Sequence, residues 1–250
     1  MRFLPVWYRN YLVWKKLAIP AILGNLADPL LYMLGLGYGL GQFLGEVGGV
    51  PYLNFLAAGT LAYSVMNAAT FETLYSSFSR MHVQKTWDAI LNTPLSLTDV
   101  LVGEWLWAAS KSVLSGLAIL AVIWGLGLYA DFALTLWLLP VILLTGLCFA
   151  GLGLMVNSVA PNYDFFMYYF TLVITPMVLL SGVFYPPDAL PGWLAGFAAT
   201  LPLTHAIELA RPLALGQQPD AIWLHALVLL GYGTLGLAAG LALTRRRLLR

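Results

Sequence analysis

The chain has 250 residues, of which 60% are hydrophobic and only 9% are charged. Its formal net charge at pH 7 is +1, and it contains a single cysteine, Cys148. Because a soluble domain is about 25% charged, this composition excludes a water-soluble globule and predicts a polytopic membrane protein. The near-neutral charge argues against a nucleic-acid-binding face. A lone cysteine provides neither an intrachain disulfide nor a cysteine-based metal cluster.

Six apolar stretches of the sequence are long enough to span a membrane. A helix needs about 20 apolar residues to cross the roughly 30 Å hydrocarbon core of a bilayer. The stretches are residues 17–40, 52–78, 100–128, 134–156, 165–184 and 222–243. Lipid offers no hydrogen-bond partner to an exposed backbone group, so each stretch is expected to be helical. The predicted fold is therefore all-α and integral to the membrane, a single domain over residues 1–250 with six transmembrane helices.

Lysine and arginine residues outside these stretches fall almost entirely on one side of the predicted membrane. They precede the first span, separate the second from the third and follow the sixth: Arg2, Arg9, Lys15, Lys16, Arg80, Lys85, Arg245, Arg246, Arg247 and Arg250. The loops of the other side contain only Arg211. The positive-inside rule therefore predicts a multi-pass protein of the bacterial inner membrane with both termini in the cytoplasm.

Residues 1–16, MRFLPVWYRNYLVWKK, are too short and too polar to be a span. Aromatic and aliphatic residues alternate there with polar and basic ones, among them Arg9 and Lys16. This pattern predicts an amphipathic helix that lies in the cytoplasmic interface, with its bases toward anionic lipid headgroups. An ordinary charged flank of the first span is the alternative.

A polar, charged stretch, residues 80–99, separates the second and third predicted spans. The spacing of its apolar residues predicts a short helix with two distinct faces. The apolar face would consist of Val83, Trp87, Ile90 and Leu91, and the polar face of Gln84, Lys85, Asp88 and Asn92. Pro94 is expected to end this helix, and Ser96-x-x-Asp99 resembles a capping box that begins the next span. An inert interfacial loop is the alternative.

Three glycine motifs predict close helix packing. Gly35-x-x-x-Gly39 and Gly37-x-x-x-Gly41 lie at the outer end of the first predicted span, and Gly236-x-x-x-Gly240 lies in the sixth. Small residues at this spacing let two helix backbones approach closely. The partner helix could belong to the same subunit or to a second copy.

Four ionisable residues are predicted to form an intramembrane polar network: Asp28, Glu72, Glu104 and Lys111. Ionisable groups at membrane depth are costly and are candidates for function. Glu104 and Lys111 are seven residues apart on one helical face, so Lys111 is expected to pair with either Glu104 or Glu72. Contact with substrate headgroups is the alternative role for these groups. Asp28 and Pro29 lie within the first predicted span. They predict either a kink in this helix, which would shape a transport path, or an interior polar pocket that holds Asp28.

Aromatic residues are concentrated on the first, second and fifth predicted spans. The fifth span begins with the run YDFFMYYF, residues 163–170. Aromatic residues at a membrane boundary usually form an interfacial belt. This concentration exceeds what anchoring needs, so a translocation path for an amphiphile is the other interpretation. The path candidates are Tyr32, Tyr63, Phe71, Tyr75, Phe165, Phe166 and Tyr169.

Residues 185–220 join the fifth and sixth predicted spans on the outer side. Prolines divide this segment, which is too apolar and aromatic for a solvated loop. Irregular backbone at membrane depth must be shielded by protein. Glu208 and Arg211 are three residues apart and predict an ion pair on a helix. His205 and Glu208 share a helical face, but no metal site is expected, because a metal ion takes about three or four protein ligands.

Three segments of the sequence carry a family resemblance that covers nearly the whole chain. They are MHVQKTWDAILNTPLSLTDVLVGEWLWAASK (residues 81–111), PNYDFFMYYFTLVITPMVLLSGVFYP (residues 161–186) and LPLTHAIELARPL (residues 201–213). Through them the chain resembles the permease, or transmembrane subunit, of type-2 ABC exporters, in the nodulation-protein-J-like branch. The resemblance implies that residues 80–95 are a cytoplasmic coupling helix and that residues 185–220 form short re-entrant helices at the outer face.

The same resemblance implies partners for the chain. The coupling helix would dock in a groove of a separate ABC ATP-binding subunit, present in two copies, through Gln84, Lys85, Thr86, Trp87 and Asp88. The chain has no G-x-x-x-x-G-K-[ST] motif, so it is not expected to be an enzyme or to hold a cofactor, and ATP and Mg would bind the partner subunit. A homodimer surrounded by membrane lipid would enclose the path of an amphiphilic substrate, and no nucleic acid is expected.

These patterns predict the membrane-spanning subunit of an ATP-driven exporter. The branch implies outward movement of an amphiphilic, lipid-linked or lipo-oligosaccharide cargo across the inner membrane. A permease for drugs or small amphiphiles is the alternative within the class, and a passive channel is the alternative outside it. An enzyme that acts on lipids would need His, Asp or Ser residues clustered at a membrane boundary, and the sequence contains no such cluster.

Overall fold

Helices make up most of the described chain. The structure is a computed structural model that describes residues 2–248, without the side chains of Asn25, Asp28 and Leu248. The first half consists of α1 (Leu4–Lys15), α2 (Ala18–Leu31), α3 (Gly37–Gly39), α4 (Gly41–Leu44), an antiparallel hairpin of β1 (Glu46–Val47) and β2 (Val50–Pro51), α5 (Tyr52–Phe71), α6 (Thr86–Leu91) and α7 (Leu97–Gly125). The second half consists of α8 (Phe132–Thr135), α9 (Leu138–Val159), α10 (Asp164–Tyr169), α11 (Thr175–Leu180), α12 (Gly192–Ala198), α13 (Pro202–Ala214) and α14 (Ile222–Leu248). Segments of π-helix continue α2 (Tyr32–Leu36), α5 (Glu72–Ser77 and Ser79–Val83) and α10 (Phe170–Ile174), and Pro187–Ala189 is a 3-10 turn.

Four helical stretches within residues 2–248 are long and apolar enough to cross a membrane. They are Ala18–Leu44, Leu97–Gly125, Phe132–Val159 and Ile222–Arg247, and they overlap the first, third, fourth and sixth predicted spans. The second predicted span falls on α5 and its π-helical continuation, and the fifth falls on the shorter apolar helix Asp164–Leu180. The long helices support a multi-pass membrane protein, and the count of six spans stays a prediction.

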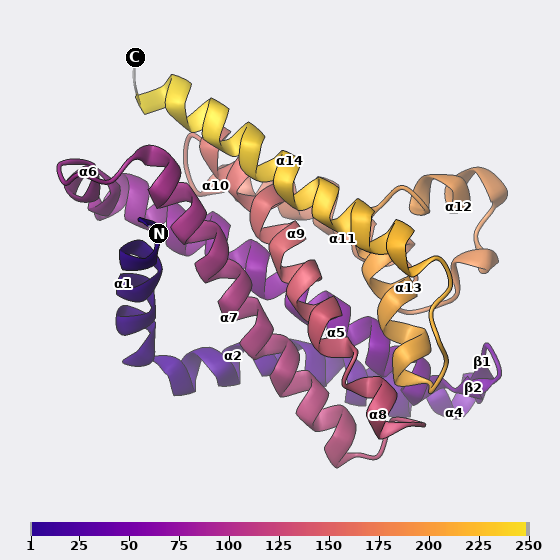
Figure 1. The fold of residues 1–250 in the computed structure, drawn as a ribbon. Helices are drawn as coiled ribbons and strands as arrows, with labels where there is room; N and C mark the ends of the chain where they lie inside the picture. Colours follow the sequence, from indigo (N-terminus) through magenta and orange to yellow (C-terminus); the bar gives the residue numbers. More distant parts are fainter. Residues whose placement is uncertain (1, 249–250) are drawn as a thin grey trace.

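The long helices run between two ends of the molecule (Figure 1). One end carries α1, α6, the beginning of α10 and the last turns of α14. We call it the basic end, because Arg9, Lys15, Arg80, Lys85 and Arg245 belong to these elements or directly adjoin them. The opposite end carries the β-hairpin, α8 and α12 (Figure 1). The first and last described residues of the chain both lie at the basic end (Figure 1).

The core lies where α5, α7, α9 and α13 pack together. Leu61 and Met66 of α5, Ile119 of α7, Phe149 of α9 and Ile207 of α13 are almost inaccessible to solvent. Among the candidate spans α9 is the most enclosed, whereas α2 leaves most of its surface exposed. The four core helices therefore form the frame, and the exposed apolar surface of α2 needs lipid or another protein to cover it.

Helix α14 lies directly against α9. A Cβ atom at Gly236 would lie 2.7 Å from the backbone carbonyl carbon of Gly151, and one at Gly240 would lie 3.2 Å from the α9 backbone. The Gly236-x-x-x-Gly240 motif therefore brings two helices of one subunit together. A Cβ atom at Gly37 would collide with the side chain of Leu53, so this glycine packs closely against α5. By contrast, no atom lies within 4 Å of the Cβ positions of Gly35 and Gly39, so that face of the first helix is open in the described chain.

The beginning of α7 confirms the predicted capping box. Ser96 Oγ accepts a hydrogen bond from Asp99 N at 3.2 Å, and Asp99 Oδ2 accepts one from Ser96 N at 2.9 Å. The short helix α6 ends at Leu91, before Pro94, as the proline predicts. Because α6 ends and α7 begins within a few residues, α6 is held at the tip of the basic end (Figure 1).

Candidate functional site

Residues 84–88 project from the basic end, and we call them the handle (Figure 1). Lys85 has a left-handed backbone with a φ of 53°, which turns the chain sharply from the π-helical segment into α6. Gln84, Lys85 and Asp88 are exposed, and Lys85 Nζ lies 3.9 Å from Asp88 Oδ2. Such an exposed pair contributes little stability, so both charges remain available to a partner. Thr86 is partly buried and accepts a 3.4 Å hydrogen bond from Arg9 Nη2.

Trp87 does not lie on the exposed face of the handle. Its side chain is 1% exposed and packs in a small core with Met81, Val100 and Leu101. Its Nε1 donates a 3.3 Å hydrogen bond to Glu104 Oε1. The structure thus corrects the prediction that Trp87 faces the partner, because the indole ring lies on the apolar, inward side of α6. Gln84, Lys85 and Asp88 keep their predicted exposure, and Thr86 is partly buried.

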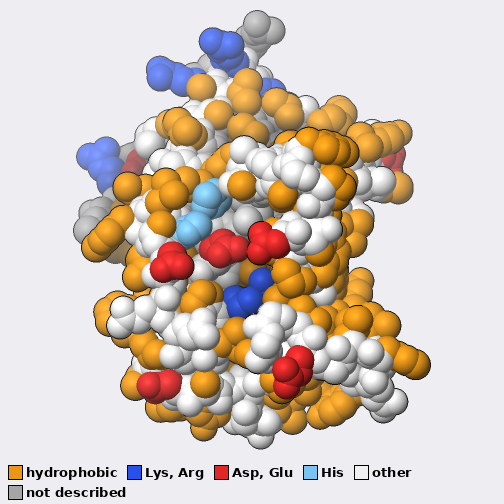
Figure 2. Space-filling model, turned by 90° about the vertical axis from the view of Figure 1, so that its right-hand side faces the viewer, with side chains coloured by type: hydrophobic (Ala, Val, Ile, Leu, Met, Phe, Trp, Pro, Cys, Tyr) orange, Lys and Arg blue, Asp and Glu red, His pale blue; other side chains and the backbone are white. Residues whose placement is uncertain are grey.

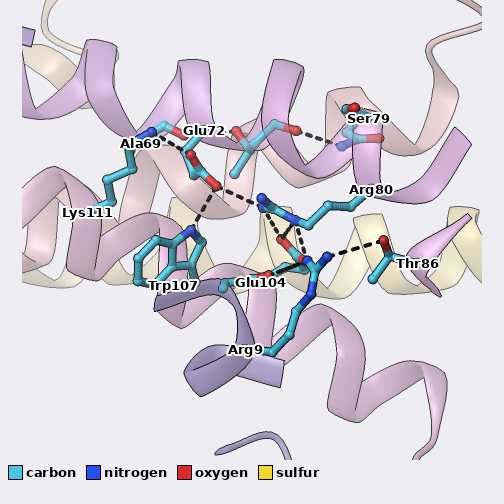
Figure 3. Close-up of polar contacts among 12 residues, drawn as sticks. Arg9, Ala69, Glu72, Ser79, Arg80, Thr86, Glu104, Trp107 and Lys111 are labelled. Atoms are coloured by element: carbon cyan, nitrogen blue, oxygen red, sulfur yellow. Dashed lines mark hydrogen bonds and ion pairs between the residues drawn. The ribbon is translucent and has the colours of Figure 1, made fainter. Parts of the chain in front are cut away.

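Behind the handle lies a set of charged side chains that we call the charge network: Glu72, Arg80, Glu104 and Lys111 (Figure 3). Arg80 stands between the two carboxylates, with Nη2 2.8 Å from Glu72 Oε1 and 2.5 Å from Glu104 Oε2. Arg80 Nε also donates to Glu104 Oε1 at 2.9 Å, which makes this pair bidentate. Lys111 Nζ lies 2.7 Å from Glu72 Oε2. Both carboxylates are almost fully buried.

Neutral donors complete the hydrogen bonding of both carboxylates. Trp107 Nε1 donates to Glu72 Oε1 at 2.8 Å. Asn10 Nδ2 donates to Glu104 Oε1 at 3.2 Å, beside the hydrogen bond from the handle tryptophan. Each carboxylate oxygen therefore accepts at least one hydrogen bond, which is the condition under which a buried ion pair is tolerated. The charge network joins α1, the π-helical end of α5, α6 and α7 into one unit.

The charge network has Arg80 at its centre, whereas the predicted polar network did not include this residue. The structure pairs Lys111 with Glu72 and leaves Glu104 to Arg80. The side chain of Asp28 lies outside the described residues. Sequence reasoning missed Arg80, because the second span was expected to end at residue 78, whereas the helix continues in π-helical turns to Val83. Such π-helical segments are frequent at functional sites, but no motif in the sequence marks this one.

Helix α1 packs against α7. Trp7 Nε1 donates a 3.0 Å hydrogen bond to Ser110 Oγ. The rings of Trp7 and Trp14 each meet the edge or face of Trp107 with centroids 6.1 Å apart. The other side of α1 is exposed and mixes apolar with basic residues. This arrangement is compatible with the predicted interfacial position, which stays a prediction.

An aromatic groove of about 390 Å³ opens between the π-helical segment after α2, the helix α5 and the helical stretch of α10 and α11. Its aromatic lining consists of Tyr32, Tyr63, Phe71, Phe170 and Phe184, and its polar lining consists of Asn67 and Thr175. The Tyr32 and Tyr63 rings meet edge to face at 5.9 Å, and the Phe71 and Phe170 rings lie 4.9 Å apart. A mostly apolar concave surface with a few polar groups is typical of a site for an apolar or amphiphilic ligand.

The structure brings together part of the predicted path. Three of the path candidates, Tyr32, Tyr63 and Phe71, line the aromatic groove although they come from two different spans. Tyr75 lies just beyond the groove and stacks on Phe71, with ring centroids 5.2 Å apart. The row of rings continues toward the basic end, because Tyr75 also stacks on Tyr163 at 6.0 Å.

The remaining path candidates do not line the aromatic groove. Phe166 is fully buried in a small core with Leu74, so the prediction that it lines a path is wrong in this structure. Phe165 and Tyr169 are partly buried beside the same core. Phe170 lines the groove, and it is the last residue of the predicted aromatic run, although it was not among the individual path candidates.

The histidines of the outer segment form a contact between helices. His205 of α13 and His225 of α14 lie with their Nδ1 atoms 2.8 Å apart. Figure 2 shows the side of the molecule that is at the right in Figure 1, where acidic side chains gather beside histidine and basic side chains. Among residues 2–248 no group of three or more His, Cys, Asp or Glu residues is arranged to hold a metal ion.

Arg211 joins α13 to the turn that follows α11. Its Nη2 donates a 2.5 Å hydrogen bond to the carbonyl oxygen of Gly182, and its guanidinium lies 3.7 Å from the centre of the Phe55 ring. Within the described chain Arg211 forms no ion pair with Glu208, which is exposed. The predicted Glu208–Arg211 pair is therefore wrong, because the arginine turns inward to a carbonyl group and an aromatic ring.

Comparison with known proteins decides the family of this chain. Residues 3–215 match the family model described as ABC-2 type transporter. The chain belongs to the ABC-2 type transporter family. It is 52% identical over 250 residues to Nodulation protein J of Rhizobium leguminosarum bv. viciae, and the match covers 100% of this chain and 96% of that protein. It is 51% identical over 245 residues to Nodulation protein J of Bradyrhizobium diazoefficiens, covering 98% and 93%. The Inner membrane transport permease YadH of Escherichia coli is more distant, at 23% identity over 203 residues, covering 80% and 76%.

Membership of the ABC-2 family confirms the resemblance seen in the sequence. The chain is an ABC-2 transporter permease, the membrane subunit of a transporter. This family implies a partner subunit that binds ATP. The handle, the charge network and the aromatic groove are thus features of a transporter subunit.

Proposed function

We propose that this ABC-2 permease is the membrane-spanning subunit of an ATP-driven exporter of an amphiphilic, lipid-linked or lipo-oligosaccharide cargo. The aromatic groove carries the proposal, because it offers flat apolar faces beside two polar side chains, as a ligand with both characters requires. The relatives named Nodulation protein J support the choice of a lipo-oligosaccharide. ATP and Mg would bind the partner subunit.

The proposed direction of transport rests on the distribution of charge. The basic end would face the cytoplasm, in accordance with the positive-inside rule, and the opposite end would face outward. Six spans would result if α5 and the helix Asp164–Leu180 also cross the inner membrane. Both termini of the described chain lie at the basic end (Figure 1), which supports an even number of crossings. The proline-rich helices α12 and α13 would then form the outer, re-entrant cap.

A homodimer would convert the aromatic groove into an enclosed path. The groove is open along one side of the single subunit, and the neighbouring helical stretch exposes the large apolar residues Met167, Tyr168 and Leu172. Apolar surface of this extent needs a partner or lipid. A second copy placed against this face would shield the groove from the bilayer, so we place the transport path between two subunits.

The ATP-binding subunits would dock on the handles of the dimer. Gln84, Lys85 and Asp88 present polar and charged groups outward, and Thr86 lies at their edge. The inward side of α6 is fixed to α7 through the hydrogen bond between Trp87 and Glu104. A movement imposed on the handle would therefore reach the transmembrane helices through the charge network rather than be lost in a flexible loop.

ATP-dependent uptake into inside-out membrane vesicles tests this function. The vesicles would contain the permease with its ATP-binding subunit, and uptake of a labelled lipo-oligosaccharide would be compared with that of a small amphiphilic drug. Phe71→Ala removes an aromatic face from the groove and is expected to weaken cargo binding roughly fivefold, about 1 kcal/mol. Phe43→Ala is the matched control, because Phe43 is 87% exposed and lies outside the groove.

The result that contradicts the proposal is equally clear. Uptake that proceeds at the same rate without ATP would indicate a passive channel. Uptake of the drug but not of the lipo-oligosaccharide would retain the exporter and replace the cargo. If Phe71→Ala and Phe43→Ala had the same effect, the groove would not be the binding surface.

A further inference from the structure

A second cavity, of about 440 Å³, lies at the basic end between α1, the beginning of α2, the π-helical end of α5 and α7. Its polar lining includes Arg9, Ser76 and Lys111, and its apolar lining includes Leu17 and Ala21. It is separate from the aromatic groove, with which it shares no lining residue. We call it the α1 cavity.

The charges around the α1 cavity are not balanced. The carboxylates of Glu72 and Glu104 are engaged by Arg80 and Lys111. In the part of the chain that the structure describes, no carboxylate lies within 4.0 Å of the Arg9 guanidinium. One cation at the cavity therefore lacks an anionic partner.

The contacts of Arg9 are with neutral groups. Its Nη1 donates to Asn10 Oδ1 at 3.0 Å, and its Nη2 donates to Thr86 Oγ1 at 3.4 Å (Figure 3). Burial and the nearby Arg80 cation lower the pKa of Arg9 from its ordinary value, although the Glu104 carboxylate acts in the opposite direction. A guanidinium nevertheless stays protonated in a protein, so the positive charge persists and favours an anion.

An unpartnered hydrogen-bond donor lies at the same cavity. Trp14 lines the cavity, and its Nε1 is buried without a hydrogen-bond partner among the described residues. A buried donor of this kind normally has an acceptor, which can be a bound ligand. An oxygen-rich anion would accept from Trp14 Nε1 and pair with Arg9 at once, because both line the same space.

The apolar side of the α1 cavity indicates that the anion carries a hydrocarbon part. Leu17 is 64% exposed and Ala21 lies one turn further along α2, where the first candidate span begins. We propose that the α1 cavity binds the phosphate headgroup of an anionic membrane lipid, with its acyl chains along the start of α2. The planar guanidinium of Arg9 suits a phosphate, since two of its nitrogens can donate hydrogen bonds to two phosphate oxygens. Bound there, the lipid holds α1 in place against α7 and the handle.

Lipid titration of the purified full-length chain, followed by native mass spectrometry, tests this site. The probes are phosphatidylglycerol, which is anionic, and phosphatidylcholine, which is neutral overall. Arg9→Gln is expected to raise the phosphatidylglycerol concentration for half-saturation about tenfold, since a charge-assisted hydrogen bond is lost. Lys16→Gln removes the same charge from an exposed residue next to α1 and outside the α1 cavity, and is expected to change it little.

A second variant keeps every basic residue. Ser76→Asp places a negative charge in the α1 cavity and is expected to weaken phosphatidylglycerol binding even if Arg9→Gln fails to fold. Equal binding of both lipids, or equal effects of Arg9→Gln and Lys16→Gln, would overturn the proposal. Displacement of the lipid by millimolar inorganic phosphate would overturn its lipid part and leave a site for a free anion. The measurement needs neither cargo nor ATP-binding subunit, so it is independent of the exporter function.

Discussion

Arg80 holds two buried carboxylates at once, and the stability of the basic end depends on it. Glu72 retains Lys111 as a second cationic partner, but Glu104 has no other cation within 4.0 Å among the described residues. Removing the arginine would leave Glu104 charged and buried with only neutral donors. An uncompensated buried charge is far more costly than an intact pair is beneficial. The two carboxylates are therefore expected to respond differently to the loss of Arg80.

We predict that Arg80→Met lowers the free energy of unfolding by about 3–5 kcal/mol. Adding Glu104→Gln to this variant removes the orphaned charge and is expected to restore part of the loss. Denaturant unfolding in detergent micelles measures both effects. Lys85→Met is the control, because Lys85 is an exposed cation of the handle and its loss is expected to change stability by about 0.5 kcal/mol or less. An Arg80→Met variant as stable as Lys85→Met would show that the charge network does not stabilise this fold.

At this scale the sequence predicts residue types better than partners. The cost of ionisable groups at membrane depth was enough to single out Glu72, Glu104 and Lys111. Their pairing depends on Arg80, which enters the network through a helical continuation that has no sequence signal. For Trp87 the helical spacing correctly predicted a position on the apolar face of α6. The docking role taken from the family resemblance conflicts with the burial of this side chain.

The packing of α14 on α9 is the most demanding contact between two elements. The backbones approach so closely at Gly236 that a side chain there would collide with the Gly151 backbone. Because the obstacle is backbone rather than the end of a flexible side chain, the helices must separate to admit a larger residue.

Gly236→Val is therefore expected to reduce the yield of folded protein and to lower its free energy of unfolding in detergent by about 1–3 kcal/mol or more. Gly231→Val in the same helix is the matched control, since nothing lies within 4 Å of the Cβ position there. Both changes add the same β-branched side chain to α14, so propensity effects cancel in the comparison. Equal stability of the two variants would refute the close packing of α9 and α14.

Elements with strong local signals are predicted well, and elements shaped by their neighbours are not. Pro94 and the Ser96–Asp99 capping box place the end of α6 and the beginning of α7 within a residue or two. The π-helical segments and the deep burial of α13 depend on contacts with distant helices. No periodicity in a single segment can report such contacts.

At the scale of the whole molecule, the fold keeps two candidate sites apart. The handle and the charge network lie at the basic end, and the aromatic groove runs along the side of the bundle between α5 and the helical stretch of α10 and α11. The groove gathers residues that are more than a hundred positions apart in the sequence, such as Tyr32 and Phe184. The sequence shows the concentration of aromatic residues, whereas the groove that some of them line required the packed structure.

The most direct test of the exporter function is purification of the tagged chain from its native membranes in gentle detergent. Mass spectrometry would identify the proteins that copurify. We predict a stoichiometric ATPase with a G-x-x-x-x-G-K-[ST] motif, bound to the wild-type chain and lost in Asp88→Arg, which reverses an exposed charge of the handle. Glu46→Arg is the control, since Glu46 is an exposed acid at the opposite end. Recovery of a pure chain without an ATPase, under conditions that preserve other membrane complexes, would contradict ATP-driven export by this permease.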